Sequence, residues 1–474
     1  MVLDSDFSKR LYQDYLIYCE NDLTKRRFNH SDILPLIERL KDKDIFKVNK
    51  VGESVGGRSI NLVTYGEGEI PVFLWSQMHG DESTATMAIF DIFNFLSAND
   101  DFNPCRKKFS KKLKIYFMPM VNPDGAELFQ RETALNIDIN RDAARTQTTE
   151  AKVLFEVFNS VKAKFGFNLH DQDRVYSAGQ SHRSAAISFL APPFNFNRDI
   201  NKTRGDAMKL IVMMNEILMQ FIPGHIAKYT DEFEPRAFGD NFQKLGTSTI
   251  LIESGSWHED PEKQFIRKLN FIALLAAFKS ISDGSYKKND IDSYNKIPDN
   301  QKNMMDLVIR NVKYTWGDKE YYIDLGINRT EVNINGSHKF YYESMLEEIG
   351  DLSVFHGYED YDFEGCSIHP GKIYGREFES PEEIKKIDFI SLYSQGYLFI
   401  KLFNQQTLED LYNLPINIVL NNSFPKSVVL KAGSRANFYL EKNGQIEYVV
   451  VNGFMFNLRS KTGEIKNGLS FYDI

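Results

Sequence analysis

The sequence contains few cysteines. Among 474 residues there are three, Cys19, Cys105 and Cys366, which lie far apart and are odd in number. Disulfide-stabilised secreted proteins carry dense, even sets of cysteines, so that class is excluded and we expect free thiols.

Long hydrophobic runs are also missing. No segment of the sequence approaches the ~18 consecutive apolar residues that suffice to cross a bilayer. The first residues include Asp4 and Asp6 and have no apolar core of the kind found in secretory signals. We therefore expect a cytoplasmic protein with no membrane partner.

An excess of basic residues is missing too. Lys and Arg number 57 and Asp and Glu number 65, which gives a formal net charge of −8. Nucleic-acid-binding proteins generally present a basic surface, so we expect no nucleic-acid partner. The hydrophobic content of 42% and the charged content of 26% are typical of a globular protein. At roughly 100–200 residues per domain, the length predicts two or three domains.

In the first half of the chain, short apolar runs alternate with amphipathic segments. Strands are expected at PVFLWSQ (71–77), KIYFMPMV (114–121), FGFNLH (165–170) and TSTILIE (247–253). Helices are expected between and after them, at residues 83–96, 149–165, 204–221 and 261–281. This alternation predicts an α/β fold, in which a largely parallel sheet is flanked by helices.

The composition changes near residue 283. The segment DGSYKKNDIDSYNKIPDN (283–300) is polar and rich in turn-forming residues, which is typical of a linker. Beyond it, β-type segments such as DLVIRNVKYTW, EYYIDLGI and QIEYVVVNGF dominate. We expect an α/β domain over residues 1–284, a linker over 285–300 and a β-rich domain over 301–474.

Metal-binding residue types follow three of the expected strands. His79 and Glu82 form an H-x-x-E pair after the first strand, His170 ends another, and Glu253 ends a third. Sites in parallel sheets gather at the carboxyl ends of the strands. Zinc prefers imidazole and carboxylate ligands, and catalytic sites leave one position for water. An H-x-x-E pair alone is weak evidence, so the interpretation depends on the residues around it.

The motifs that surround the H-x-x-E pair follow one another in a characteristic order along the chain. The chain presents VGESVGGRSI, QMHGDES, NPDG, Arg131, NIDINRD (136–142), NLHDQ and ILIESG. Together they resemble the zinc carboxypeptidases of the M14 peptidase family, over about residues 51–281. The resemblance implies a mixed, largely parallel α/β sheet, with residues 1–284 as the catalytic domain. It also implies one Zn²⁺ per chain, held by His79, Glu82 and His170.

The resemblance also assigns roles around the metal. Glu253 would be the general base that activates the zinc-bound water. Arg131 would polarise the scissile carbonyl and stabilise the oxyanion. Asn140 and Arg141 would hold the terminal carboxylate of the substrate, and Asp138 would orient a ligating histidine.

Two parts of the sequence depart from the family's pattern. The family carries a substrate-binding tyrosine on a mobile loop before the base, and Tyr229 lies at a compatible distance from Glu253 in a segment that does not settle the match. After His170 the chain reads Asp-Gln-Asp-Arg (171–174), which is more charged than a typical member. The substrate's side-chain preference therefore stays open.

A fainter resemblance concerns the second domain. The segments MMDLVIRNVKY (304–314) and LKAGSRANFYLEKNGQIEYVVVNG (430–453) are similar to the small β-sandwich that flanks the barrel in amidohydrolases. This likeness implies a non-catalytic accessory domain, because the metal-binding barrel itself is missing from the sequence.

The leading functional hypothesis is a metallocarboxypeptidase that acts on a peptide or peptide-like substrate with a free carboxylate. A deacylase or amidase, acting on acylated amino acids or cell-wall-type peptides, is an alternative on the same scaffold. A binding protein that has lost catalysis is a second alternative. The oligomeric state is left open by the sequence.

Overall fold

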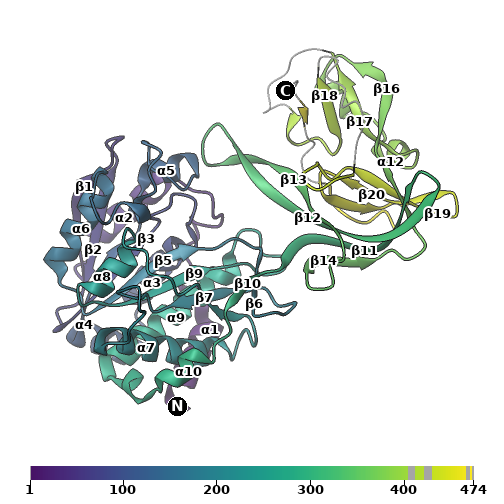
Figure 1. Ribbon diagram of the computed structural model, residues 1–474. Coiled ribbons are helices and arrows are strands. Elements are labelled where there is room, and N and C mark those ends of the chain that lie inside the picture. The colour runs from purple at the N-terminus through teal and green to yellow at the C-terminus, as the bar shows by residue number, and fades with distance from the viewer. Residues whose placement is uncertain (1, 404–410, 421–429, 466–469, 472–474) are drawn as a thin grey trace. The chain divides into compact units, whose positions relative to one another are not determined.

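The chain forms two compact units, Met1–Lys302 and Asn303–Ile474. The computed structural model describes residues 2–403, 411–420, 430–465 and 470–471. Figure 1 shows helices around a sheet in the N-terminal unit and mostly strands in the C-terminal unit. Each unit has hydrophobic clusters of its own.

The N-terminal unit is organised around an eight-stranded sheet with the order β1-β2-β4-β3-β5-β9-β7-β8. Its strands are β1 (Phe46–Glu53), β2 (Ser59–Tyr65), β3 (Ile70–Ser76), β4 (Leu113–Met118), β5 (Phe165–Asp171), β7 (Ile187–Leu190), β8 (Ile226–Lys228) and β9 (Ser248–Ser254). The four central strands, from β4 to β9, are parallel, whereas β1, β2 and β7 contribute antiparallel pairs. The mixed, largely parallel sheet expected from the sequence is confirmed.

Helices cover both faces of this sheet (Figure 1). They are α1 (Val2–Tyr18), α2 (His30–Lys41), α3 (Thr84–Ser97), α4 (Asn103–Lys112), α5 (Pro123–Leu128), α6 (Thr149–Val161), α7 (Lys202–Leu218), α8 (Phe238–Lys244), α9 (Gln264–Asp283) and α10 (Ile291–Asn295), with short 3₁₀ helices η1 (Ile139–Arg141) and η2 (Ser285–Lys288). A separate two-stranded ribbon pairs β6 (Tyr176–Ala178) with β10 (Asn300–Lys302).

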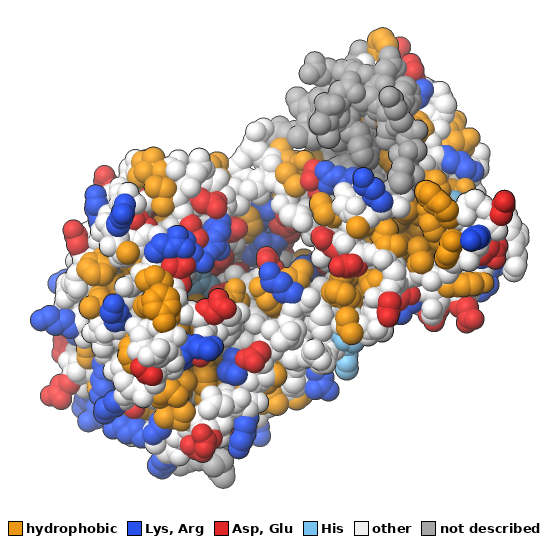
Figure 2. Space-filling view, in the orientation of Figure 1, with side chains coloured by type: hydrophobic (Ala, Val, Ile, Leu, Met, Phe, Trp, Pro, Cys, Tyr) orange, Lys and Arg blue, Asp and Glu red, His pale blue; other side chains and the backbone are white. Residues whose placement is uncertain are grey.

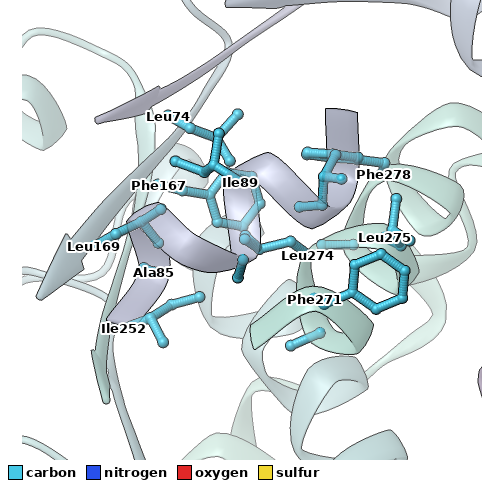
Figure 3. Packing of buried hydrophobic residues seen from close by; sticks show 14 of the residues in the cluster. Leu74, Ala85, Ile89, Phe167, Leu169, Ile252, Phe271, Leu274, Leu275 and Phe278 are labelled. Carbon is cyan, nitrogen blue, oxygen red and sulfur yellow. The ribbon is translucent and has the colours of Figure 1, made fainter. Parts of the chain in front are cut away.

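The alternation of side chains along β3 divides the core into two layers. Val72 and Leu74 belong to the cluster built with α3 and α9, and Figure 3 shows Leu74 packed with residues of both helices. Phe73 and Trp75 point the other way, into the cluster built with α6 and α8. Because successive strand side chains face opposite sides, a run of apolar residues serves both layers.

Strand β5 is different, because only one of its faces is wholly apolar. Phe165, Phe167 and Leu169 enter the same layer as α3 and α9, as Figure 3 shows for the last two. Asn168 and His170 alternate with them and therefore point to the opposite face. The face of β5 that lies on the α6 and α8 side of the sheet therefore carries polar side chains, whereas the same face of β3 carries Phe73 and Trp75.

Residues 285–300 differ from the expected linker. They form η2 and α10, and Tyr286, Tyr294 and Ile297 are buried in the main core of the N-terminal unit. The hydroxyl oxygen of Tyr294 also accepts the backbone N–H of Ala191 at 3.1 Å. Three large side chains buried at separate positions attach the segment to the N-terminal unit despite its polar composition.

The C-terminal unit is rich in strands, as expected. One sheet has the order β13-β12-β11-β15-β19-β20-β21, with β14 paired to β11, and the other has the order β16-β17-β18-β22. The elements are β11 (Met304–Trp316), β12 (Lys319–Ile334), β13 (Lys339–Gly350), β14 (His356–Asp362), β15 (Ser367–Pro370), β16 (Lys372–Phe378), α11 (Pro381–Ile384), α12 (Phe389–Tyr393), β17 (Tyr397–Leu402), β18 (Asn417–Leu420), β19 (Phe438–Lys442), β20 (Gln445–Val451), β21 (Phe454–Asn457) and β22 (Ser470–Phe471). The likeness to an amidohydrolase sandwich stays a prediction.

None of the described helices combines the length and the apolar character needed to cross a bilayer. On the visible face of the N-terminal unit, acidic and basic side chains are interspersed (Figure 2).

Candidate metal centre

The predicted metal ligands lie at the carboxyl ends of two neighbouring strands. His79 and Glu82 are in the loop that joins β3 to α3, and His170 is in β5. The loop packs tightly against the start of α5, since a Cβ atom at Gly80 would come within 2.0 Å of the carbonyl carbon of Gly125. Glycine permits this close approach, which holds the loop with its ligands facing the end of β5.

The ligand atoms of these three side chains converge. Nδ1 of His79 lies 2.7 Å from Oε1 of Glu82, and Nδ1 of His170 lies 2.6 Å from Oε2 of the same carboxylate. The three ligand atoms are all within 4.8 Å of one another, and all three side chains are buried. Two imidazoles and one carboxylate are the donor set that zinc favours in catalytic sites, so these residues fit a zinc ion.

The electrostatics of the cluster favour a cation. Burial opposes a charge on His79, but the carboxylates of Glu82 and Asp138 raise the pKa of His79 to about 9. Burial likewise opposes the charge of Glu82, but the two histidines hold the pKa of Glu82 well below its usual range. Surroundings that stabilise an imidazolium beside a carboxylate also stabilise a divalent cation there.

Asp138 and Arg131 form a second layer behind His79. Oδ1 of Asp138 lies 3.0 Å from Nε2 of His79, which leaves Nδ1 of the ring directed at Glu82. Arg131 donates to Oδ2 of Asp138 from both Nε and Nη2, at 3.1 and 3.0 Å. Its Nη1 lies 3.4 Å from Oε1 of Glu82, so the guanidinium stands beside the cluster.

Glu253 stands on the strand next to His170. The two residues are register partners in the parallel pair β5–β9. Burial, reinforced by the negative charge of Glu82, raises the pKa of Glu253 well above its usual range. A buried carboxyl group with a raised pKa, adjacent to a cation site, has the character of a general base or acid.

Asn140 and Arg141 belong to η1, directly after Asp138. Asp138 accepts the backbone N–H of Asn140 at 2.8 Å, and Oδ1 of Asn140 accepts the backbone N–H of Phe238 at 3.0 Å. The side chain of Arg141 is 42% exposed, and its Nε lies 3.6 Å from Oε2 of Glu234. Arg141 is therefore the more accessible of the two for an incoming anion.

Most of these residues line one cavity of about 620 Å³. Eight of the nine residues predicted from the sequence line it, namely His79, Glu82, Arg131, Asn140, Arg141, His170, Tyr229 and Glu253. Asp138 lies behind His79 instead. Tyr229 follows β8, where its backbone N–H donates to the carbonyl of Phe189, and burial raises the pKa of its hydroxyl.

Residues 33–169 match the family described as zinc carboxypeptidase, peptidase family M14. This part of the N-terminal unit is similar to the zinc carboxypeptidase family. The match includes His79, Glu82, Arg131, Asn140 and Arg141, and it ends one residue before His170.

Individual proteins are also similar to parts of this chain. Carboxypeptidase 2 of Trichophyton rubrum is 35% identical over 116 residues, covering 24% of this chain and 20% of the relative. Carboxypeptidase SOL1 of Arabidopsis thaliana is 29% identical over 104 residues, covering 21% of each protein. The chain thus spans about a fifth of the length of these curated relatives. A solved metallo-carboxypeptidase from Burkholderia cenocepacia aligns with 54% of this chain and 70% of its own, at 15% identity and a TM-score of 0.44.

Some residues of the cavity were not singled out from the sequence. Asn168 and Asp240 line it, and so does Lys263, whose Nζ donates to Oδ2 of Asp171 at 3.1 Å. Asn168 could have been found, because it precedes His170 by two residues and so shares its face of β5. Asp240 and Lys263 carry no such local signal, since only the folding of α8 and of the turn before α9 brings them to the site.

Proposed function

We propose that the N-terminal unit is a zinc-dependent metallocarboxypeptidase that hydrolyses the C-terminal peptide bond of a peptide. One observation carries this proposal. Three zinc-type ligand atoms converge within 4.8 Å, in the same cavity as a buried carboxyl group and an accessible arginine. Residues 303–474 act as a non-catalytic accessory unit in this proposal.

His79, Glu82 and His170 would hold the zinc ion. When bound, zinc acts as a Lewis acid and lowers the pKa of bound water to ~7. Glu253 takes a proton from the attacking water and passes it to the leaving amine, and its raised pKa suits proton transfer near neutral pH. Arg131 stabilises the negative charge that develops on the carbonyl oxygen.

The remaining residues bind the substrate. Asn140 and Arg141 hold the terminal carboxylate, for which the planar guanidinium offers two parallel donors. Tyr229 donates its hydroxyl to the substrate from the cavity wall. Asp138 keeps Nε2 of His79 protonated, so that Nδ1 stays available as a ligand.

The zinc assignment is tested by removing one ligand. We expect the purified full-length protein to contain about one zinc per chain and Glu82→Ala to contain almost none, because two imidazoles alone hold zinc weakly. Elemental analysis after chelator-free gel filtration measures the content, with the exposed-residue variant Glu67→Gln as the control. Full zinc occupancy in Glu82→Ala would contradict the assignment.

The carboxylate-binding role of Arg141 separates a carboxypeptidase from a deacylase. We expect Arg141→Ala to raise KM by about 10- to 100-fold for peptides with a free α-carboxylate, since a charge-assisted hydrogen bond is worth about 1.5–3 kcal/mol. The same peptides with an amidated C-terminus serve as the matched substrates. If wild-type protein hydrolyses both forms equally well, the carboxypeptidase proposal fails.

A further inference from the structure

A largely buried lysine joins three elements at the edge of the cavity. Nζ of Lys263 donates to Oδ2 of Asp171, the last residue of β5, and to the carbonyl oxygen of Ser254, the last residue of β9, at 3.1 Å in each case. The hydroxyl of Thr84, the first residue of α3, donates to the same carboxylate oxygen at 2.5 Å. These four residues, called the Lys263 cluster below, connect the start of a helix to the ends of two strands.

The three elements that the cluster connects carry the proposed metal ligands and base. His170 and Glu253 are the penultimate residues of β5 and β9, and Glu82 lies two residues before α3 begins. The backbone N–H of Asp171 donates to Oε2 of Glu82 at 3.2 Å, so the cluster also contacts a proposed ligand directly.

The strands and the helix differ in how they are attached to one another. β5 and β9 are paired along their whole length, which fixes their ends relative to each other. The start of α3 follows a loop and lies outside this ladder, so side-chain contacts attach it to the strands. Thr84 reaches Asp171, and Lys263 donates to the same oxygen of that carboxylate. The cluster therefore holds α3, and with it the loop that carries Glu82, on the strand ends.

The ion pair of the cluster is shielded from water on most sides. The side chains of Lys263 and Asp171 are 14% and 9% exposed. Taking two charges out of water is costly, and apolar side chains of similar size often stabilise a fold equally well. A gain in stability therefore does not by itself account for the pair, whereas its directed hydrogen bonds suit a role in holding groups at fixed distances.

The backbone of Lys263 lies in the left-handed region, with φ of 51° and ψ of 30°. This conformation is unfavourable for a residue with a Cβ atom, and glycine would adopt it without that cost. The carboxylate of Asp260 fixes the turn, since it accepts the backbone N–H groups of Gln264 and Phe265 at 2.8 Å each. A lysine in place of glycine, in a fixed turn beside the cavity, is the kind of backbone strain that concentrates at functional sites.

We propose that Lys263 is a positioning residue for the metal ligand Glu82. By fixing the carboxylate of Asp171, it holds the start of α3 against β5, and with it the distances from Glu82 to the other ligands and to the base. Groups behind a metal ligand commonly change metal affinity by about 10- to 100-fold. Asp171 is the first of the charged residues 171–174 that depart from the family's pattern, and the cluster gives it a role. This inference rests on the proposed function for the presence of the metal.

Zinc affinity tests this role without any turnover. We expect the zinc dissociation constant of full-length Lys263→Ala, measured by competition with a chelating dye, to rise by about 10- to 100-fold. Added n-propylammonium should restore the affinity, because Lys263 lines the cavity and a small cation can take the place of its side chain. The neutral n-propanol should not. Lys279→Ala, the same change in an ion pair at the other end of α9, is the matched control. An unchanged affinity, or a loss that n-propylammonium does not restore, overturns the inference.

A second variant leaves the ion pair intact, so that no charge is buried without its partner. Thr84→Val keeps the shape of the side chain but removes the hydroxyl that links α3 to Asp171. We expect its zinc dissociation constant to rise by about tenfold. Thr24→Val, at an exposed position, is the control and should bind zinc as the wild type does. A wild-type zinc affinity in Thr84→Val overturns the inference, whatever the stability of Lys263→Ala.

Turnover provides a separate readout. At saturating zinc, Thr84→Val should lower kcat by about 10- to 100-fold, since small displacements at a site are costly for the rate. Its KM should stay near the wild-type value, because Thr84 is not among the residues that line the cavity. If the wild type binds zinc but hydrolyses no peptide, the proposed function is wrong and the zinc affinities still decide the role of Lys263. If peptides are hydrolysed and both variants bind zinc normally, only the inference about Lys263 fails.

Discussion

Glu253→Gln is expected to lower kcat by about 10²–10⁴-fold, which is the usual contribution of a general base. Glutamine has nearly the same shape as glutamate but accepts no proton, so the cavity keeps its form. The zinc content should stay at the wild-type level, because Glu253 is not a ligand in the proposed site. Initial rates of amino-acid release from a peptide, together with elemental analysis, measure both quantities.

The matched control for this variant is Glu67→Gln, which makes the same chemical change at an exposed position. It should hydrolyse the peptide at the wild-type rate. If Glu253→Gln retains zinc and more than a tenth of the wild-type kcat, Glu253 is not the base.

The largest expected effect on stability concerns a buried ion pair between α3 and α9. Arg267 and Asp91 have fully buried side chains, and Nε of Arg267 donates to Oδ2 of Asp91 at 2.7 Å. Asp91 also accepts the hydroxyl of Tyr15 at 2.8 Å and the backbone N–H of Glu20 at 2.7 Å. We expect Arg267→Met to lower the free energy of unfolding by about 3–5 kcal/mol, because it leaves a buried carboxylate without its cation.

Chemical denaturation followed by circular dichroism measures this loss. The double variant Asp91→Leu/Arg267→Met should recover part of it, since no unpaired charge then remains inside. Removing the exposed pair of α2 through Lys41→Ala should change the free energy of unfolding by about 1 kcal/mol or less. If Arg267→Met is as stable as the wild type, Asp91 is neutral or solvated in the folded protein.

The sequence was sufficient for the central sheet but not for the segment that follows α9. Alternating apolar runs predicted the parallel strands, because strands buried on both faces need continuous apolar side chains such as those of β3. In residues 285–300, three buried side chains are scattered among polar ones, and no periodicity marks them. Their burial depends on packing against distant parts of the chain, which a local pattern does not record.

The residues of the candidate site also fall into two groups, those that the sequence predicted and those that it did not. His79, Glu82, His170 and Glu253 could be predicted to lie together, because each follows or ends a strand of one sheet. Asp240 lies in a short helix whose position over the strands follows from the packing of Phe238 and Phe242 into the core. Lys263 has a left-handed backbone, with φ of 51°, at the residue before α9. Neither placement follows from the neighbouring sequence.

The division of the cavity wall between strand ends and α8 has a consequence for how this scaffold can change. The proposed metal ligands and the proposed base come from the β3–α3 loop, β5 and β9, whereas α8 lines the same cavity through Gly239 and Asp240 and supplies none of them. We therefore expect substitutions at the cavity-lining positions of α8 to alter which substrates fit while leaving the proposed catalytic residues unchanged. For an engineer, this makes Gly239 and Asp240, which line the cavity, better positions for a library of altered substrate preference than the core residues Phe238 and Phe242.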